Sequence, residues 1–199
     1  MKPKYYTCKL ETDIVLNASL ATEGNMQTLD YIPGSKFWGI VASQKYKNLV
    51  QNNQHQKILD YFHNGNISFG NAFISANGEL GYPLPFSLFQ DKLSKEIIGA
   101  DVYVHHALGQ KKKIMSSKKI DGKESEIQLK QHRSGYLTRN NNYIKDVKKR
   151  FSLKSAQCRT NRKSMDGSIF GFESLGAGQI FIFSVFYSCL LYTSDAADE

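Results

Sequence analysis

The hydrophobic pattern of the chain changes its period at Pro33-Gly34, and this change limits the folds that the chain can adopt. Apolar and polar side chains alternate over residues 5–16, which is typical of a half-buried β-strand. After the Pro-Gly pair, apolar side chains recur at helical spacing, with Phe37, Ile40 and Val41 on one face. Ser35 is expected to cap this helix, because its hydroxyl can accept a hydrogen bond from the first turn.

The rest of the chain reads mainly as strands. A second short helix is expected over residues 54–63, followed by a stop at Asn64-Gly65-Asn66. One helix after an opening strand, and then mostly strands, favours an α+β fold. The further strands are expected at 67–75, 100–108, 151–156 and on both sides of Gly176-Ala177-Gly178, and the charged residues 109–125 are expected to form a loop.

The chain is basic. It has 26 Lys and Arg residues against 18 Asp and Glu residues, a net charge of +8. Proteins of this charge often bind an anionic partner, most often nucleic acid, although a well-solvated surface is the alternative. No apolar run is long enough to span a bilayer, and the first residues have no signal-peptide core. The three cysteines show no spacing for a metal or a disulfide framework, so we expect a cytoplasmic protein without membrane, metal or cofactor.

Two parts of the sequence carry residue types that suit RNA or DNA. The turn before the first helix offers backbone amides, the helix dipole and a lysine to an anion, although a capped helix with a solvated lysine is the alternative. Residues 133–163 interleave arginines and lysines with aromatic side chains. Guanidinium groups bind phosphates, and aromatic faces stack on unpaired bases. The residues expected to bind RNA are Gly34, Ser35, Lys36, Arg133, Arg159, Arg162 and Lys163.

No catalytic residue is assigned. Asp30 and His105 are the nearest candidates for RNA cleavage, as a metal-binding carboxylate and a general base, but neither lies in a recognisable motif. His105 and His106 are adjacent, so in a strand they point to opposite faces, which is poor geometry for a shared metal.

Two stretches resemble the RAMP superfamily, the repeat-associated proteins of type III CRISPR effector complexes. The segment YIPGSKFWG (31–39) is similar to the family motif (Y/F)IPGSSLRG, with Ile32 to Ser35 and Gly39 matching and Lys36 to Trp38 departing from it. The segment CRTNRKSMDGSIFGFESLGAGQIFIFSVF (158–186) is similar to the family's basic strand, variable linker, strand, Gly-containing turn and strand.

The resemblance implies a ferredoxin-like, RRM-like RAMP domain that binds guide RNA (crRNA) in antiviral defence. The domain would span residues 1–188, carry an insert at about 78–148, and end before its last helix and strand. Guide RNA, target RNA and other effector subunits would be its partners. An RNA endonuclease of the same superfamily, acting on guide precursor or target RNA, and a basic adaptor without nucleic-acid binding are the alternatives.

The last residues, CLLYTSDAADE (189–199), are expected to be non-native. The codons TGT CTC TTA TAC ACA TCT for the first six resemble a transposon end used to prepare sequencing libraries, and the next codons continue like the adapter. On this interpretation, the natural protein continues differently after Ser188.

Overall fold

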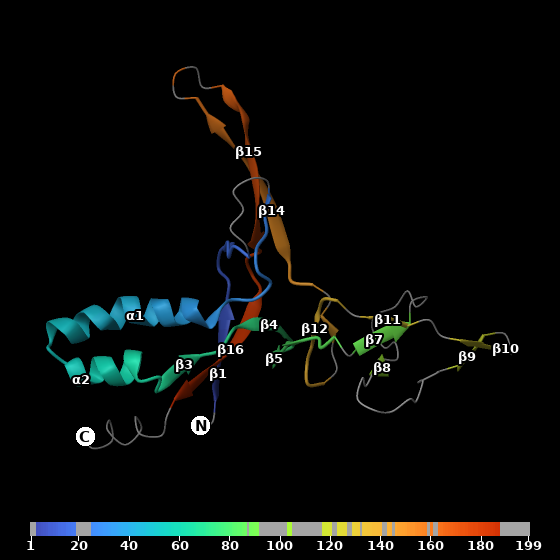
Figure 1. Cartoon of the computed structure of the whole chain (residues 1–199), viewed down its shortest axis with the longest axis horizontal. Coiled ribbons are helices and arrows are strands. Elements are labelled where there is room, and N and C mark those ends of the chain that lie inside the picture. Colours follow the sequence, from blue (N-terminus) through green and yellow to red (C-terminus); the bar gives the residue numbers. More distant parts are fainter. Residues whose placement is uncertain are drawn as a thin grey trace. The chain divides into compact units, whose positions relative to one another are not determined.

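The chain forms two units in a computed structural model (Figure 1). Unit 1 comprises Met1–Leu80 and Val147–Glu199, and unit 2 comprises Gly81–Asp146. Among the described residues, strands predominate and the helices lie in one stretch of unit 1, so the expected α+β class is confirmed. The structure describes residues 3–18, 25–86, 88–91, 103–104, 117–120, 123–126, 129–131, 133–140, 143–144, 146–158, 160 and 163–187.

An antiparallel sheet forms the centre of unit 1. Its strand order is β1-β16-β4-β5, and β3 also pairs with β16. The side chains of β16 are mostly apolar because the strand is central: Phe181 is 0% and Ile182 is 6% exposed, although they point to opposite faces. The strands are β1 (Lys4–Lys9), β3 (Ile67–Phe69), β4 (Phe73–Ala76), β5 (Glu79–Leu80) and β16 (Ile180–Tyr187).

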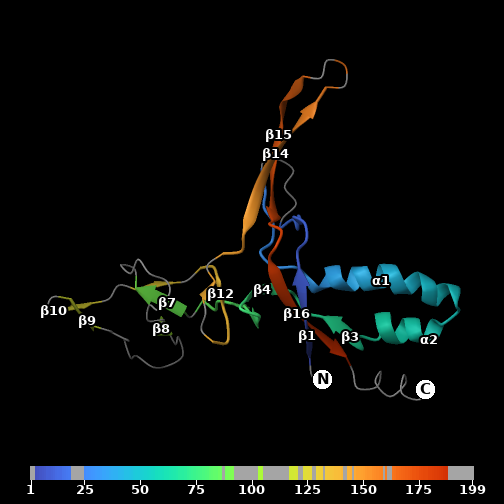
Figure 2. The ribbon, with the colours of Figure 1, turned by 180° about the vertical axis from the view of Figure 1, so that it is seen from behind.

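A long hairpin forms the second sheet of unit 1. Strands β14 (Lys149–Gln157) and β15 (Ser164–Leu175) pair antiparallel, and β2 (Asn25–Met26) adds to β15 in parallel. Figures 1 and 2 both show β14 and β15 side by side as an extended hairpin. The strand expected at 151–156 is therefore confirmed. So are the two strands around Gly176-Ala177-Gly178, which belong to different sheets.

The helical part of unit 1 is a pair of neighbouring helices. The first is α1 (Gly34–Gln51), and the second is α2 (His55–Ile58), which continues into the π-helical turn η1 (Leu59–His63). The second helix thus lies where it was expected and ends before Gly65, whose φ of +68° suits glycine. The rings of Trp38 and Tyr46 on α1 form T-shaped contacts with the ring of Phe62, with centroids 5.6 and 5.4 Å apart.

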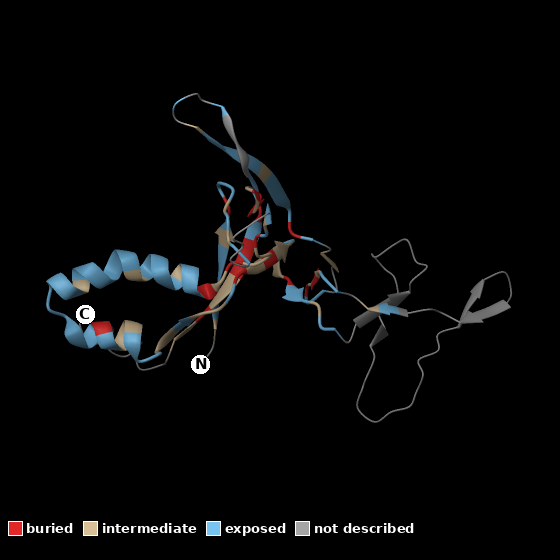
Figure 3. Ribbon diagram, turned by 45° about the horizontal axis from the view of Figure 1, so that its top comes forward, coloured by how far each residue is buried: buried red, intermediate tan, exposed pale blue. Residues whose placement is uncertain are grey.

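The expected cap and apolar face of α1 need correction. Pro33 occupies the N-cap position and no side chain caps the helix from there, so the prediction that Ser35 is the cap was wrong. Phe37 stacks on Phe183 with ring centroids 4.0 Å apart, but Ile40 is 56% and Val41 38% exposed. Figure 3 shows the same contrast: buried residues gather where α1 begins, and most of both helices is exposed.

Three expectations about the extent of strands and loops were also wrong. The first strand ends at Lys9 instead of residue 16, and beyond it Ile14 forms only an isolated bridge with Leu175. The strand expected at 67–75 is interrupted between Phe69 and Phe73, where the pairing with β16 shifts its register by one residue. The expected loop at 109–125 contains a hairpin of β9 (Ser117–Ile120) and β10 (Lys123–Glu126), because main-chain pairing tolerates charged side chains.

Unit 2 is built from short antiparallel strands. Tyr136 is 3% exposed and belongs to a sheet of order β13-β12-β6. Another sheet has the order β11-β7-β8. No helix in the described part of the chain is both long and apolar enough to cross a membrane. The strands are β6 (Tyr82–Pro83), β7 (Leu88–Asp91), β8 (Tyr103–Val104), β11 (Leu129–Gln131), β12 (Tyr136–Leu137) and β13 (Tyr143–Ile144).

Candidate nucleic-acid interface

The amides at the start of α1 are largely used within the protein. Gly34 N–H donates to Asn71 Oδ1 at 3.0 Å, and Lys36 N–H donates to the Pro33 carbonyl at 2.9 Å. Ser35 N–H has no partner among the described residues. Of the amides that the sequence offered to a phosphate, Ser35 N–H is therefore the one still able to donate.

Gly34 has a structural reason to be glycine. A Cβ at this position would overlap the main-chain carbonyl of Phe69 and lie 2.9 Å from the Gly70 oxygen. The neighbouring Ile32 exchanges two main-chain hydrogen bonds with Ala72, at 3.0 and 2.8 Å. The Ile-Pro-Gly part of the motif thus docks α1 onto the chain between β3 and β4, independently of any ligand.

Lys36 is the charged group of this turn. Its side chain is exposed, no acidic residue lies in the first turn of α1, and no ion pair involves it within the described residues. A cation here opposes the helix dipole, so an anion bound nearby would stabilise both.

The described cations that are expected to bind RNA between residues 133 and 163 belong to different units. Arg133 is exposed and belongs to unit 2, whereas Lys163 is exposed and belongs to unit 1. Arg159 and Arg162 lie outside the described residues, as does His105. These positions therefore leave untested the expectation that this segment binds RNA.

Two further cations of this segment hold the base of the hairpin. Arg150 pairs with Asp13 at 3.1 Å. Lys149 Nζ lies 3.7 Å from Glu173 and donates to the Thr28 carbonyl at 3.1 Å. Both cations have carboxylate partners within unit 1, which reduces their attraction for phosphate.

Beyond this base, the hairpin exposes an apolar strip that we call the hairpin strip: Phe151, Leu153 and Ile169. Their exposed fractions are 52%, 65% and 68%. The register places Phe151 opposite Glu173, Leu153 opposite Gly171 and Ser155 opposite Ile169, so these side chains share one face. The Phe151 ring lies over Gly171, where a Cβ would overlap it. On the other face, Lys154 lies opposite Phe170, which is 41% exposed.

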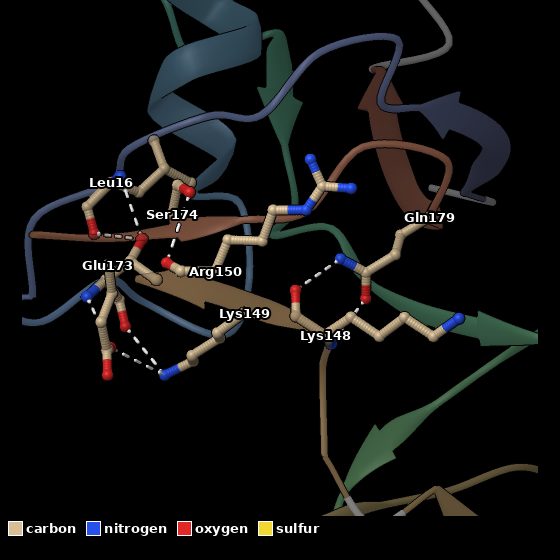
Figure 4. A network of polar contacts seen from close by, with 8 residues as sticks. Leu16, Lys148, Lys149, Arg150, Glu173, Ser174 and Gln179 are labelled. Atoms are coloured by element: carbon tan, nitrogen blue, oxygen red, sulfur yellow. Dashed lines mark hydrogen bonds and ion pairs between the residues drawn. The ribbon is translucent and has the colours of Figure 1, made fainter. Parts of the chain in front are cut away.

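A polar network, the turn clasp, joins the two sheets of unit 1 at residues 176–179. Asp13 accepts a hydrogen bond from Ala177 N–H at 2.7 Å with one oxygen, and binds Arg150 with the other. The Gln179 amide, part of the network in Figure 4, donates to the carbonyls of Lys148 and Gly176 and accepts from Lys148 N–H, at 2.8 to 2.9 Å. The sequence analysis did not anticipate the clasp, because an isolated Asp or Gln gives no signal of distant partners.

Of the two candidates for RNA cleavage, the structure describes Asp30 but not His105. Asp30 is half-buried between β2 and α1, and no three His, Cys, Asp or Glu side chains in the described residues come close enough to hold a metal ion. Burial raises the pKa of the Cys8 thiol, which favours the protonated form. Burial raises the pKa of Tyr143, and the Asp146 carboxylate raises it further.

Comparison with known proteins gives little beyond this geometry. No family model matches the chain, and no curated protein matches it. Among solved structures, it is similar to a chain described as "Type III-B Cmr-beta Cryo-EM structure of the Apo state". That similarity has a TM-score of 0.46 and 9% identity, and it covers 96% of this chain and 89% of the other. A TM-score below 0.5 does not define a shared fold.

Proposed function

We propose that this chain is a non-catalytic, guide-RNA-binding subunit of a type III CRISPR effector complex. The two stretches that resemble RAMP proteins support the family, and the net charge of +8 supports an anionic partner. The hairpin strip is the observation that most supports RNA contact. Exposed apolar side chains on this basic hairpin suit contact with unpaired bases. Target RNA and other effector subunits are the proposed partners, in the cytoplasm.

The order of elements in unit 1 supports a ferredoxin-like fold. A ferredoxin-like unit has the order β-α-β-β-α-β. Here β1, α1, β4 and β16 follow its first four positions, and β16 pairs with both β1 and β4. Under this proposal, the segment between β4 and β16 contains the insertion, and the remaining helix and strand belong to the natural chain beyond Ser188.

Phosphate binding would be the electrostatic part of this function. Ser35 N–H and the Lys36 ammonium group would hold one phosphate at the helix N-terminus. Contacts between cations and phosphates do not depend on the base sequence of the RNA. Base pairing by the guide RNA would therefore select the target RNA. The remaining proposed phosphate contacts are Arg133, Arg159, Arg162 and Lys163.

Salt dependence is the first test of the proposal. We expect the affinity of the purified chain for labelled single-stranded RNA to fall steeply with salt, because phosphate contacts release counterions. We expect Lys36→Ala to weaken binding and to reduce the slope of log K against log salt by about 1. Fluorescence anisotropy titrations over a series of salt concentrations measure both quantities.

Lys45→Ala is the matched control, because Lys45 is also exposed on α1 but lies away from its first turn. Its slope should stay closer to that of the wild-type chain. An RNA affinity that does not change with salt would contradict the proposed phosphate site. Equal losses of affinity in Lys36→Ala and Lys45→Ala would contradict it as well.

Base stacking on the hairpin strip is a separate prediction. Leucine retains apolar cover over Gly171 but has no aromatic face, so Phe151→Leu should leave the hairpin folded. The loss of one stacked base should cost about 1–3 kcal/mol of RNA-binding free energy. Phe86→Leu is the control, because Phe86 is 70% exposed but belongs to unit 2. Unchanged affinity of Phe151→Leu in the same titration would exclude base stacking at this residue.

A further inference from the structure

A side-chain amide lies beside the Phe151 ring of the hairpin strip. It belongs to Asn25 on β2, which the register places opposite Gly171, and Leu153 faces Gly171 from the other side. Residues opposite each other in a sheet point to the same face, so Asn25 shares the face of the hairpin strip. A Cβ at Gly171 would lie 2.5 Å from Asn25 Oδ1 and would also overlap the Phe151 ring. The amide and the ring are therefore neighbours above this glycine.

Gly171 leaves room for both side chains and lies buried beneath them. Both neighbours face the solvent, because Asn25 is exposed and Phe151 is 52% exposed. Within the described part of the chain, no hydrogen bond engages the Asn25 amide. An aromatic ring and an amide that can both donate and accept thus stand side by side on an open surface.

The hairpin around this pair of side chains is basic. Residues 149–175 contain six Lys and Arg residues against two Asp and Glu residues, and Lys154 and Lys163 are exposed. A phosphate backbone complements this charge. The site lies on the second sheet of unit 1, whereas the helix and strand proposed beyond Ser188 would add to the central sheet. Those elements therefore do not require this surface.

We propose that Phe151 and Asn25 form a site for one base of single-stranded RNA, and that this site favours adenine. The inference rests on the proposed function and adds a base preference to it. The ring stacks on the base, and the amide pairs with the edge of the base. Adenine presents a donor beside an acceptor on both free edges, N6–H with N1 or N6–H with N7. Guanine presents such a pair on one edge only, and the smaller pyrimidine rings cover less of Phe151.

Binding of two labelled oligonucleotides to the whole 199-residue chain tests this preference. One is a short oligouridine, and the other carries a single central adenine. We expect the adenine to strengthen binding about tenfold in fluorescence anisotropy titrations, as one bidentate pair can. Asn25→Ala should remove this difference. Asn48→Ala is the matched control, because Asn48 is also exposed but lies on α1, and it should retain the difference.

Asn25→Asp tests pairing with the base edge independently of folding. The carboxylate has the shape of the amide but only accepts, and guanine offers two adjacent donors, N1–H and N2–H. This variant should therefore favour a central guanine over a central adenine, whereas a purely structural role of Asn25 predicts no change in base preference. The ratio of the two affinities is the measurement, because the added negative charge weakens both.

Equal affinity of the wild-type chain for the adenine and uridine oligonucleotides would overturn the inference. So would an adenine preference that survives Asn25→Ala or Asn25→Asp. In either case, salt-dependent binding of both oligonucleotides that weakens in Phe151→Leu would leave the proposed function intact. If the wild-type chain bound neither oligonucleotide, the proposed function and this inference would both be wrong.

Discussion

Gly34→Ala should lower the free energy of unfolding by about 3 kcal/mol. The added methyl group would overlap the Phe69 carbonyl, and a main-chain oxygen cannot rotate away as a side chain can. Relief requires α1 to move from β3, which would strain the hydrogen bond from Gly34 N–H to Asn71 and the Ile32–Ala72 bridge. Urea unfolding followed by circular dichroism measures the change.

Gly39→Ala provides the matched control on the same helix. A Cβ at Gly39 meets nothing within 4 Å, so only the helix propensity of the residue changes. Alanine is favoured over glycine in a helix interior by about 1 kcal/mol, and this variant should be more stable than the wild type. If both alanines had the same effect, the close approach of α1 to Phe69 would be excluded.

We expect Gln179→Leu to lower the free energy of unfolding by a similar amount, about 3 kcal/mol. Gln179 is 8% exposed, and its amide satisfies the N–H and C=O of Lys148 and the carbonyl of Gly176. Leucine has a comparable size but can neither donate nor accept. Each buried polar group left without a partner costs about 1–3 kcal/mol. The same urea unfolding experiment measures the loss.

Gln56→Leu is the control for the loss of an amide. Gln56 is exposed and donates to Asp60 at 3.3 Å on the surface of α2. Water can replace this bond, so the free energy of unfolding should change by no more than about 0.5 kcal/mol. A Gln179→Leu variant as stable as Gln56→Leu would show that the turn clasp does not hold the two sheets together.

The sequence analysis found the residues at the start of α1 but not what most of them do. Pro33-Gly34 ends the extended chain and begins the helix, as its period change predicts. However, the acceptor for Gly34 N–H is Asn71, from a distant part of the sequence, instead of a local serine. The local sequence pattern indicates where a helix tends to begin. The partner of a buried amide depends instead on which segments the fold brings together.

The basic residues show the same limit. Their number and spacing were visible in the sequence, but Arg150 and Lys149 form ion pairs with Asp13 and Glu173 at the base of the hairpin. The sequence does not show which residue a lysine or arginine will contact. Solvated, phosphate-binding and structural cations therefore cannot be distinguished from the sequence. The sequence also did not show that the apolar side chains of the hairpin strip are exposed. Apolar and polar residues alternate along a strand in the same way whether its apolar face is buried or exposed.

The sequence by itself determined the α+β class, the helices after Pro33, the strand of β14 and the positive charge, since each follows from composition or from the period of neighbouring side chains. Only the tertiary structure decided that Gly34 contacts Phe69 and that Gln179 holds the turn between two sheets. Contacts between residues distant in the chain arise when elements pack, and packing depends on the whole fold.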